Sequence, residues 1–119
     1  MTAGTLGAWG EKKAAQYLRR QGYKTVEMNY RCRYGEIDVI AENREYIVFA
    51  EVKLRKNAAF AQAREFVNYS KQQRIIAAAQ LWLMQHETQK QPRFDVIEIY
   101  APDGASGRNI SLNHIENAF

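Results

Sequence analysis

The chain has 119 residues, of which 46% are hydrophobic and 25% are charged, and these proportions predict a single globular domain over residues 1–119. No apolar run approaches the ~20 residues of a membrane helix and no apolar signal segment opens the chain, so we expect a cytoplasmic protein without a membrane partner. The single cysteine, Cys32, excludes an internal disulfide framework, and the net charge of +4 permits nucleic-acid binding without requiring it.

The first predicted element is an amphipathic helix over residues 6–21, with Thr5 as candidate N-cap and Gly22 as the candidate residue just beyond its C-terminus. Glu11 lies in the N-terminal half of this helix. Taken alone, Glu11 is most simply a solvated carboxylate. The alternative is an acid that leans over a site formed by the strands that follow.

A strand is predicted over residues 24–30, and a short basic turn containing Arg31, Arg33 and Tyr34 follows it. Two arginines and a tyrosine at such a turn can contact a backbone phosphate or stack on a base. They can equally form a solvated turn, and the residues alone leave both interpretations open.

Two alternating runs, residues 36–42 and 46–54, predict a β-hairpin. Because side chains alternate along a strand, one face of the pair is wholly apolar and the other carries Asp38, Glu51 and Lys53. The apolar set, which we expect to be buried together, consists of Ile37, Val39, Ala41, Val48, Ala50, Val52 and Leu54.

The turn of the hairpin decides which acids face each other. A two-residue turn at positions 44–45 places Asp38 directly opposite Glu51, with Cβ atoms roughly 4.5–5.5 Å apart. A turn at positions 43–44 places Glu36 opposite Glu51 and leaves Asp38 one diagonal away. Either turn keeps the carboxylates together, whereas a slip by one residue would bury them.

Two facing carboxylates repel each other by roughly 1–4 kcal/mol at about 4 Å. Lys53 offsets only part of this repulsion, whereas a divalent cation removes it and takes hard oxygen ligands such as Asp38, Glu51 and the backbone carbonyl of Val52. Lys53 is then placed to hold or deprotonate a water beside the metal, as metal-dependent phosphodiester cleavage requires. The simpler alternative is that these are ordinary charged residues on the wet face of an amphipathic hairpin.

The second half of the chain opens with a polar connection, and residues 58–69 are compatible with a short helix. Ser70 is the candidate N-cap of a long helix over residues 71–86. Lys71 and Arg74 lie in its first turns, where they are candidate phosphate contacts or simply exposed helix cations.

A strand over residues 94–100 and an apolar tail over residues 109–119 complete the chain. Asp95 is most simply the partner of a nearby cation, and His86 and His114 share no metal-ligand spacing and receive no role. The predicted fold class is α/β, a mixed β-sheet flanked by helices in the order αβββαβ.

Taken together, these residues resemble the YraN-type family, a bacterial group placed with the restriction-endonuclease-like, or PD-(D/E)xK, nucleases and near archaeal Holliday-junction resolvases. The resemblance covers nearly the whole chain. Its motifs are Gly7-x-x-Gly10-Glu11, Asn29-Tyr30-Arg31, Gly35-Glu36-Ile37-Asp38-Val39-Ile40, Phe49-Ala50-Glu51-Val52-Lys53-x-Arg55, Lys71-x-x-Arg74, Arg93-Phe94-Asp95-Val96 and His114-Ile115-Glu116-Asn117-Ala118-Phe119. One departure from the superfamily name is that an isoleucine, not a proline, precedes Asp38.

The resemblance implies a restriction-endonuclease-like core and a nuclease triad of Asp38, Glu51 and Lys53, with Glu11 as a fourth, helix-borne acid that supports the metal shell. It also implies attack of water on a phosphodiester with Mg²⁺, or Mn²⁺ in its place, as the cofactor. The products implied are a 5′-phosphate and a 3′-hydroxyl.

The favoured hypothesis is a metal-dependent DNA endonuclease in which five cations draw in the phosphate backbone: Arg31, Arg33, Arg55, Lys71 and Arg74. The alternative is a non-catalytic nucleic-acid-binding adaptor on a nuclease scaffold, and a weaker third hypothesis is a protein-interaction domain. The residues do not distinguish branched, nicked and single-stranded DNA. A homodimer suits paired incisions in a junction, but no apolar stripe requires one.

Overall fold

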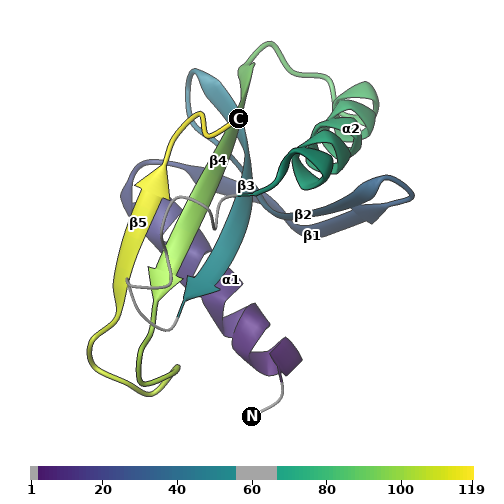
Figure 1. The fold of residues 1–119 in the computed structure, drawn as a ribbon. Coiled ribbons are helices and arrows are strands. Elements are labelled where there is room, and N and C mark those ends of the chain that lie inside the picture. Colours follow the sequence, from purple (N-terminus) through teal and green to yellow (C-terminus); the bar gives the residue numbers. More distant parts are fainter. Residues whose placement is uncertain (1–2, 56–66) are drawn as a thin grey trace.

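In the described part of the chain, a mixed five-stranded β-sheet with one helix on each face forms the centre of the protein (Figure 1). The computed structural model describes residues 3–55 and 67–119. The elements are α1 (Ala3–Arg20), β1 (Lys24–Cys32), β2 (Gly35–Glu42), β3 (Tyr46–Arg55), α2 (Tyr69–Gln85), β4 (Gln91–Tyr100) and β5 (Ser111–Ile115). The strands lie in chain order across the sheet, with β3 and β4 parallel and the other neighbours antiparallel.

This arrangement confirms the predicted α/β class and the order αβββαβ, and it is compatible with a restriction-endonuclease-like core. The apolar tail adds β5 at the edge of the sheet. Its apolar side chains pack against the core as expected: Ile110, Leu112, Ile115 and Phe119. Among the described residues, no helix is both long and apolar enough to cross a membrane.

The C-terminus of α1 has the predicted glycine cap. Gly22 has a left-handed φ of +95°, its N–H donates to the Arg19 carbonyl at 3.1 Å, and the Tyr23 N–H donates to the Leu18 carbonyl at 2.9 Å. These two bonds satisfy carbonyls that the end of the helix would otherwise leave without a donor. At the other end the expectation was wrong, because α1 begins before Thr5 and includes it.

The N-cap of α2 also differs from the expectation. The side chain of Asn68 accepts a hydrogen bond from the Lys71 N–H at 2.8 Å, so Asn68 is the N-cap and Ser70 lies within the first turn. Asparagine caps a helix at least as well as serine, and the helix therefore extends back to the earlier residue. The short helix expected at residues 58–69 falls largely outside the described residues.

The hairpin of β2 and β3 has the register set by a two-residue turn at positions 44–45. Val39 pairs with Ala50, and the Asn43 N–H donates to the Tyr46 carbonyl at 3.0 Å. The side chain of Asn43 also accepts from the N–H groups of Glu45 and Tyr46, which fixes the turn. Of the two turns left open by the residues, the structure selects the one that places Asp38 level with Glu51.

Both faces of the sheet are buried. The α1 cluster, between that helix and the sheet, contains Ala14, Leu18, Tyr23, Val39, Ala41, Val48, Ala50, Ile97 and Ile99. The α2 cluster, on the other face, contains Ile37, Ile40, Ile47, Phe49, Val67, Ile75, Ala78, Ala79, Trp82 and Val96. The acid-bearing face of the hairpin is therefore not simply its wet face, because Ile40, Ile47 and Phe49 give that face an apolar half that α2 covers.

The β1–β2 hairpin changes the side that it presents to each helix at one point along its length. Met28 and Val39 pair with each other and pack in the α1 cluster. Ile37 was expected to be buried with Val39, but it packs in the α2 cluster. Asn29, beside Met28, has a left-handed φ of 54°, which strands rarely contain. Asp38 is the residue between Ile37 and Val39, so it lies where the region covered by α1 meets the region covered by α2.

Candidate metal and nucleic-acid site

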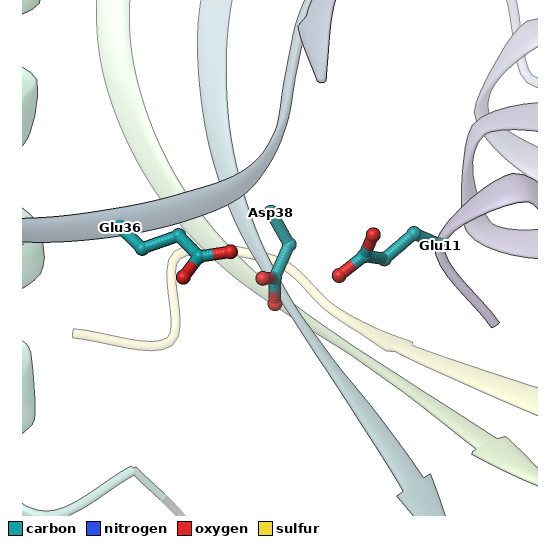
Figure 2. Close-up of side chains that lie close together, drawn as sticks. All are labelled: Glu11, Glu36 and Asp38. Atoms are coloured by element: carbon teal, nitrogen blue, oxygen red, sulfur yellow. The ribbon is translucent and has the colours of Figure 1, made fainter. Parts of the chain in front are cut away.

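Three carboxylates converge at this boundary. Glu11 of α1 and the β2 residues Glu36 and Asp38 each offer an oxygen, and these oxygens all lie within 4.8 Å of one another. Figure 2 shows Asp38 between the two glutamates, with the three carboxylates directed toward the same point. The predicted approach of Glu11 to Asp38 is thus present in the geometry. Glu36 was not among the predicted site residues, although its position two residues before Asp38 on one strand was a signal for it.

Asp38 is held in a setting that disfavours its charge. Burial and the neighbouring Glu51 raise the pKa of Asp38 to about 8, and Glu11 adds to the rise. The one opposing contact is the Val52 N–H, which donates to Oδ2 of Asp38 at 2.8 Å. Val52 was predicted as a ligand through its carbonyl, but the contact that the structure provides is this N–H, which orients the aspartate.

Glu51 lies next to Asp38 but its charge is matched by lysines. The side chain is only 4% exposed, and its Oε2 lies 2.8 Å from the Lys71 Nζ and 3.6 Å from the Lys53 Nζ. The hydrogen bond to Glu51 raises the pKa of Lys71 against the opposing effect of burial. Lys71 was predicted as a phosphate contact and Lys53 as the lysine that holds a water beside the metal; the structure brings both to Glu51, with Lys71 closer.

A cavity of about 240 Å³ opens between the hairpin and the first turns of α2. It is lined by Gly35, Glu36, Asp38, Glu51, Lys71, Arg74 and Ile75. Acids from β2 and β3 and cations from α2 therefore share one space. Such a mixed lining can hold a metal ion and a phosphate next to each other, because each charge finds its opposite within the cavity.

The remaining predicted phosphate contacts fall into two groups. Arg31 and Arg33 are exposed at or next to the turn between β1 and β2, and the Arg31 Nε lies 3.6 Å from Oε1 of Glu36. Arg55 is different: its side chain is 12% exposed and its Nη2 lies 3.5 Å from Oε2 of the buried Glu98. Arg55 is the last residue of β3 and contacts a carboxylate of the neighbouring strand β4, so the structure places it in an internal ion pair and not on an open surface.

The carboxylate group fits a divalent metal. Its donors are hard oxygens from Glu11, Glu36 and Asp38, which Mg²⁺ and Mn²⁺ prefer, and they come from a helix and a strand whose backbones are fixed by the core. Burial first, then Glu51 and to a smaller extent Glu11, raise the pKa of Asp38 and so disfavour its charged form. A bound cation would favour the charged form. Glu51 lies outside this group of three in the observed arrangement.

A second polar cluster lies on the α1 side of the sheet and joins α1, β4 and β5. Asp95 is fully buried and accepts two hydrogen bonds from Arg93, as well as one from His114 Nε2 at 2.7 Å. The Tyr17 hydroxyl lies 3.0 Å from Nδ1 of His114, and the Asn117 N–H donates to Asp95 at 3.0 Å. The expectation that Asp95 pairs with a nearby cation is confirmed, whereas the place of His114 in this cluster was not foreseen.

The fold and the site define an α/β protein in which a carboxylate group and a cation-lined cavity lie where two helices meet one mixed sheet. The pattern of uncharacterised protein family UPF0102 matches residues 10–99, and the chain belongs to this family. The expected membership of the YraN-type family is thereby confirmed.

Relatives in this family align along almost their whole length. The UPF0102 protein of Caldanaerobacter subterraneus subsp. tengcongensis is 46% identical over 117 residues, which cover 97% of this chain and 94% of that protein. The UPF0102 protein of Alkaliphilus oremlandii is 43% identical and covers 96% of this chain and 97% of its own length. That of Vibrio parahaemolyticus is 45% identical, with 95% and 90% covered. These names specify no reaction.

Proposed function

We propose that this protein is a metal-dependent DNA endonuclease that hydrolyses a phosphodiester bond with Mg²⁺ or Mn²⁺. The observation that carries the proposal is the convergence of Glu11, Glu36 and Asp38 beside a cavity that also contains Lys71 and Arg74. Carboxylates without a metal would repel a phosphate, and cations without carboxylates would only bind one. The two sets together supply what phosphodiester cleavage needs.

In this proposal Asp38, Glu11 and Glu36 hold the ion. When bound, a divalent ion there lowers the pKa of water and neutralises charge on the phosphate. Lys53 positions the attacking water, and Glu51 keeps the Lys53 ammonium in place through its 3.6 Å contact. The Val52 N–H keeps Asp38 aimed into the cavity. The contacts of Asp38 with Val52 and of Lys53 with Glu51 support these roles.

The cations on the α2 side bind the DNA backbone. Lys71 and Arg74 line the cavity, and Arg31 and Arg33 lie near the turn between β1 and β2. A DNA strand that enters from that side therefore meets positive charge before it reaches the acids. Arg55 is left out of this set because of its contact with Glu98.

The proposal is tested with labelled junction, flap, nicked and single-stranded DNA incubated with Mg²⁺ or Mn²⁺. Asp38→Asn should abolish cleavage and leave DNA affinity equal to or higher than that of the parent at the same salt concentration. The matched control is Glu42→Gln. Glu42 lies on the same strand as Asp38 but does not line the cavity, and its Oε1 is paired with the Lys90 Nζ at 3.0 Å. Cleavage by Asp38→Asn at the parental rate would overturn the proposal.

One observation favours the alternative of a non-catalytic nucleic-acid-binding adaptor. Lys71 lies 2.8 Å from Glu51, so one of the acids is neutralised by the protein itself. Calorimetry with Mg²⁺ and Mn²⁺, with and without DNA, separates the two functions. If the parent shows a heat of metal binding and Asp38→Asn does not, the result supports the nuclease. If the protein binds DNA but no metal, the result supports the adaptor.

A further inference from the structure

Two exposed tyrosines share a shallow hollow next to the acidic cavity. Tyr34, in the turn between β1 and β2, is 40% exposed, and Tyr69, the first residue of α2, is 74% exposed. Among the described residues only two other large apolar side chains are so exposed, and neither lines this hollow. The hollow has a volume of about 420 Å³ and is lined by Tyr34, Tyr69, Ser70, Gln73, Arg74 and Ala77.

The hollow and the acidic cavity are adjacent parts of one surface. Arg74 lines both, and the neighbouring residues Tyr34 and Gly35 line one each. The turn between β1 and β2 lies against α2, since a Cβ at Gly35 would be in van der Waals contact with the Cβ of Arg74 at 3.4 Å. The turn and the helix are therefore in contact at this point, and the two hollows share a wall.

The charges around the hollow suit a polyanion. The Arg33 guanidinium stacks on the Tyr34 ring at 4.9 Å and donates to its hydroxyl at 2.8 Å, which orients the ring. Arg74 lines the hollow, and Lys71 lines the cavity one helical turn away. Exposed aromatic faces among cations are the combination with which proteins bind unpaired bases, because the rings stack on bases while the cations contact the backbone.

We infer that Tyr34 and Tyr69 hold an unpaired DNA base while the adjoining phosphate of the same strand lies in the acidic cavity. Inside a duplex both faces of a base are covered by its neighbours, so an internal base can offer a face to a tyrosine only when it is unpaired and unstacked. The inference deepens the proposed function and rests on it: the substrate class becomes DNA with a single-stranded segment at the point of cleavage.

The test is a binding measurement made without cleavage, in a chelating buffer. Fluorescence anisotropy compares a labelled single-stranded oligonucleotide with the blunt duplex of the same sequence. Tyr69→Ala and Tyr34→Ala should each weaken single-strand binding by about 5- to 100-fold. Tyr69→Phe, which keeps the ring, should bind like the parent, and Met84→Ala is the matched control because Met84 is exposed on the same helix outside the hollow.

A fluorescent base analogue, 2-aminopurine, placed at an unpaired position reports stacking directly. We expect the parent and Tyr69→Phe to quench its fluorescence, and Tyr69→Ala not to. Equal single-strand affinity in Tyr69→Ala, Tyr34→Ala and the parent would overturn the inference. So would a change of oligomeric state in these variants without a change in DNA binding, because the hollow would then be a protein contact.

The two proposals fail separately. Metal-dependent cleavage that is indifferent to both tyrosines would preserve the nuclease and overturn the base-stacking inference. Tyrosine-dependent binding of single strands without cleavage under any metal would support base stacking and overturn the nuclease.

Discussion

Replacing Asp38 with asparagine is expected to stabilise the metal-free protein at neutral pH, even though it removes a residue of the proposed site. Burial and the neighbouring Glu51 raise the pKa of Asp38 from its ordinary value of 3.8 to about 8. At pH 7 the folded protein must therefore either protonate this carboxyl or keep two carboxylates facing each other. Asparagine carries no charge, and its amide oxygen can still accept the Val52 N–H.

The magnitude follows from proton linkage. A carboxyl whose pKa is higher in the folded than in the unfolded state opposes folding increasingly as the pH rises from the unfolded value to the folded one. For Asp38 this window extends from about pH 4 to about pH 8. A pH of 7 lies about 3 units above the pKa of this carboxyl in the unfolded chain. At about 1.4 kcal/mol per unit, the raised pKa lowers the free energy of unfolding by about 4 kcal/mol. Asp38→Asn should remove up to this amount at pH 7 and almost nothing near pH 4.

The assay is urea unfolding followed by tryptophan fluorescence, in buffer with a chelator, at several pH values across the window. Glu42→Gln is the control, because the loss of its surface ion pair with Lys90 should change the free energy of unfolding by at most about 1 kcal/mol. An Asp38→Asn protein that is no more stable than the parent at pH 7 would refute the reasoning. A gain that stays constant across the window would refute it equally.

Three further changes probe other parts of the structure. Asp95→Asn should lower the free energy of unfolding by about 3 kcal/mol, because it removes the buried anion 2.7 Å from Arg93 and leaves, among the described residues, only the exposed Glu116 at 3.5 Å. Burial raises the pKa of Asp95, but hydrogen bonds from His114 and Arg93 outweigh this effect and lower the pKa overall. The stabilising effect of Asp95 is thus present above about pH 4 and lost below it. In acid, urea unfolding should therefore give the parent and Asp95→Asn similar free energies of unfolding. Gly22→Ala should lower stability by about 1–2 kcal/mol, seen as a lower Tm, because its φ of +95° is left-handed. Glu36→Gln should reduce the rise in Tm that Mn²⁺ produces in the parent, because one carboxylate of the three is lost.

The features that the residues predicted are those set by local rules. The alternation along β2 and β3 and the two-residue turn before Tyr46 determine the hairpin register, so the approach of Asp38 to Glu51 follows from short-range geometry. Gly22 ends α1 for an equally local reason, the need for a left-handed residue.

The features that the residues did not predict depend on which helix covers which face. Alternation shows that Ile40 and Phe49 share a face with Asp38, but it does not show that α2 lies over them. Without that packing, the contact of Lys71 with Glu51 has no signature in the sequence. The left-handed Asn29 likewise belongs to tertiary structure, because nothing in its neighbours requires the hairpin to change sides there.

The cluster around Asp95 affects the order in which the chain can complete its fold. The hydroxyl of Tyr17 meets His114 across 97 residues of sequence, and the His114 ring and the Asn117 N–H arrive at Asp95 only with β5. During synthesis both helices and the first four strands must therefore wait, with Asp95 incompletely paired, until residues 111–117 have left the ribosome. Contacts of such sequence separation slow folding and leave a partly folded chain exposed to aggregation for longer.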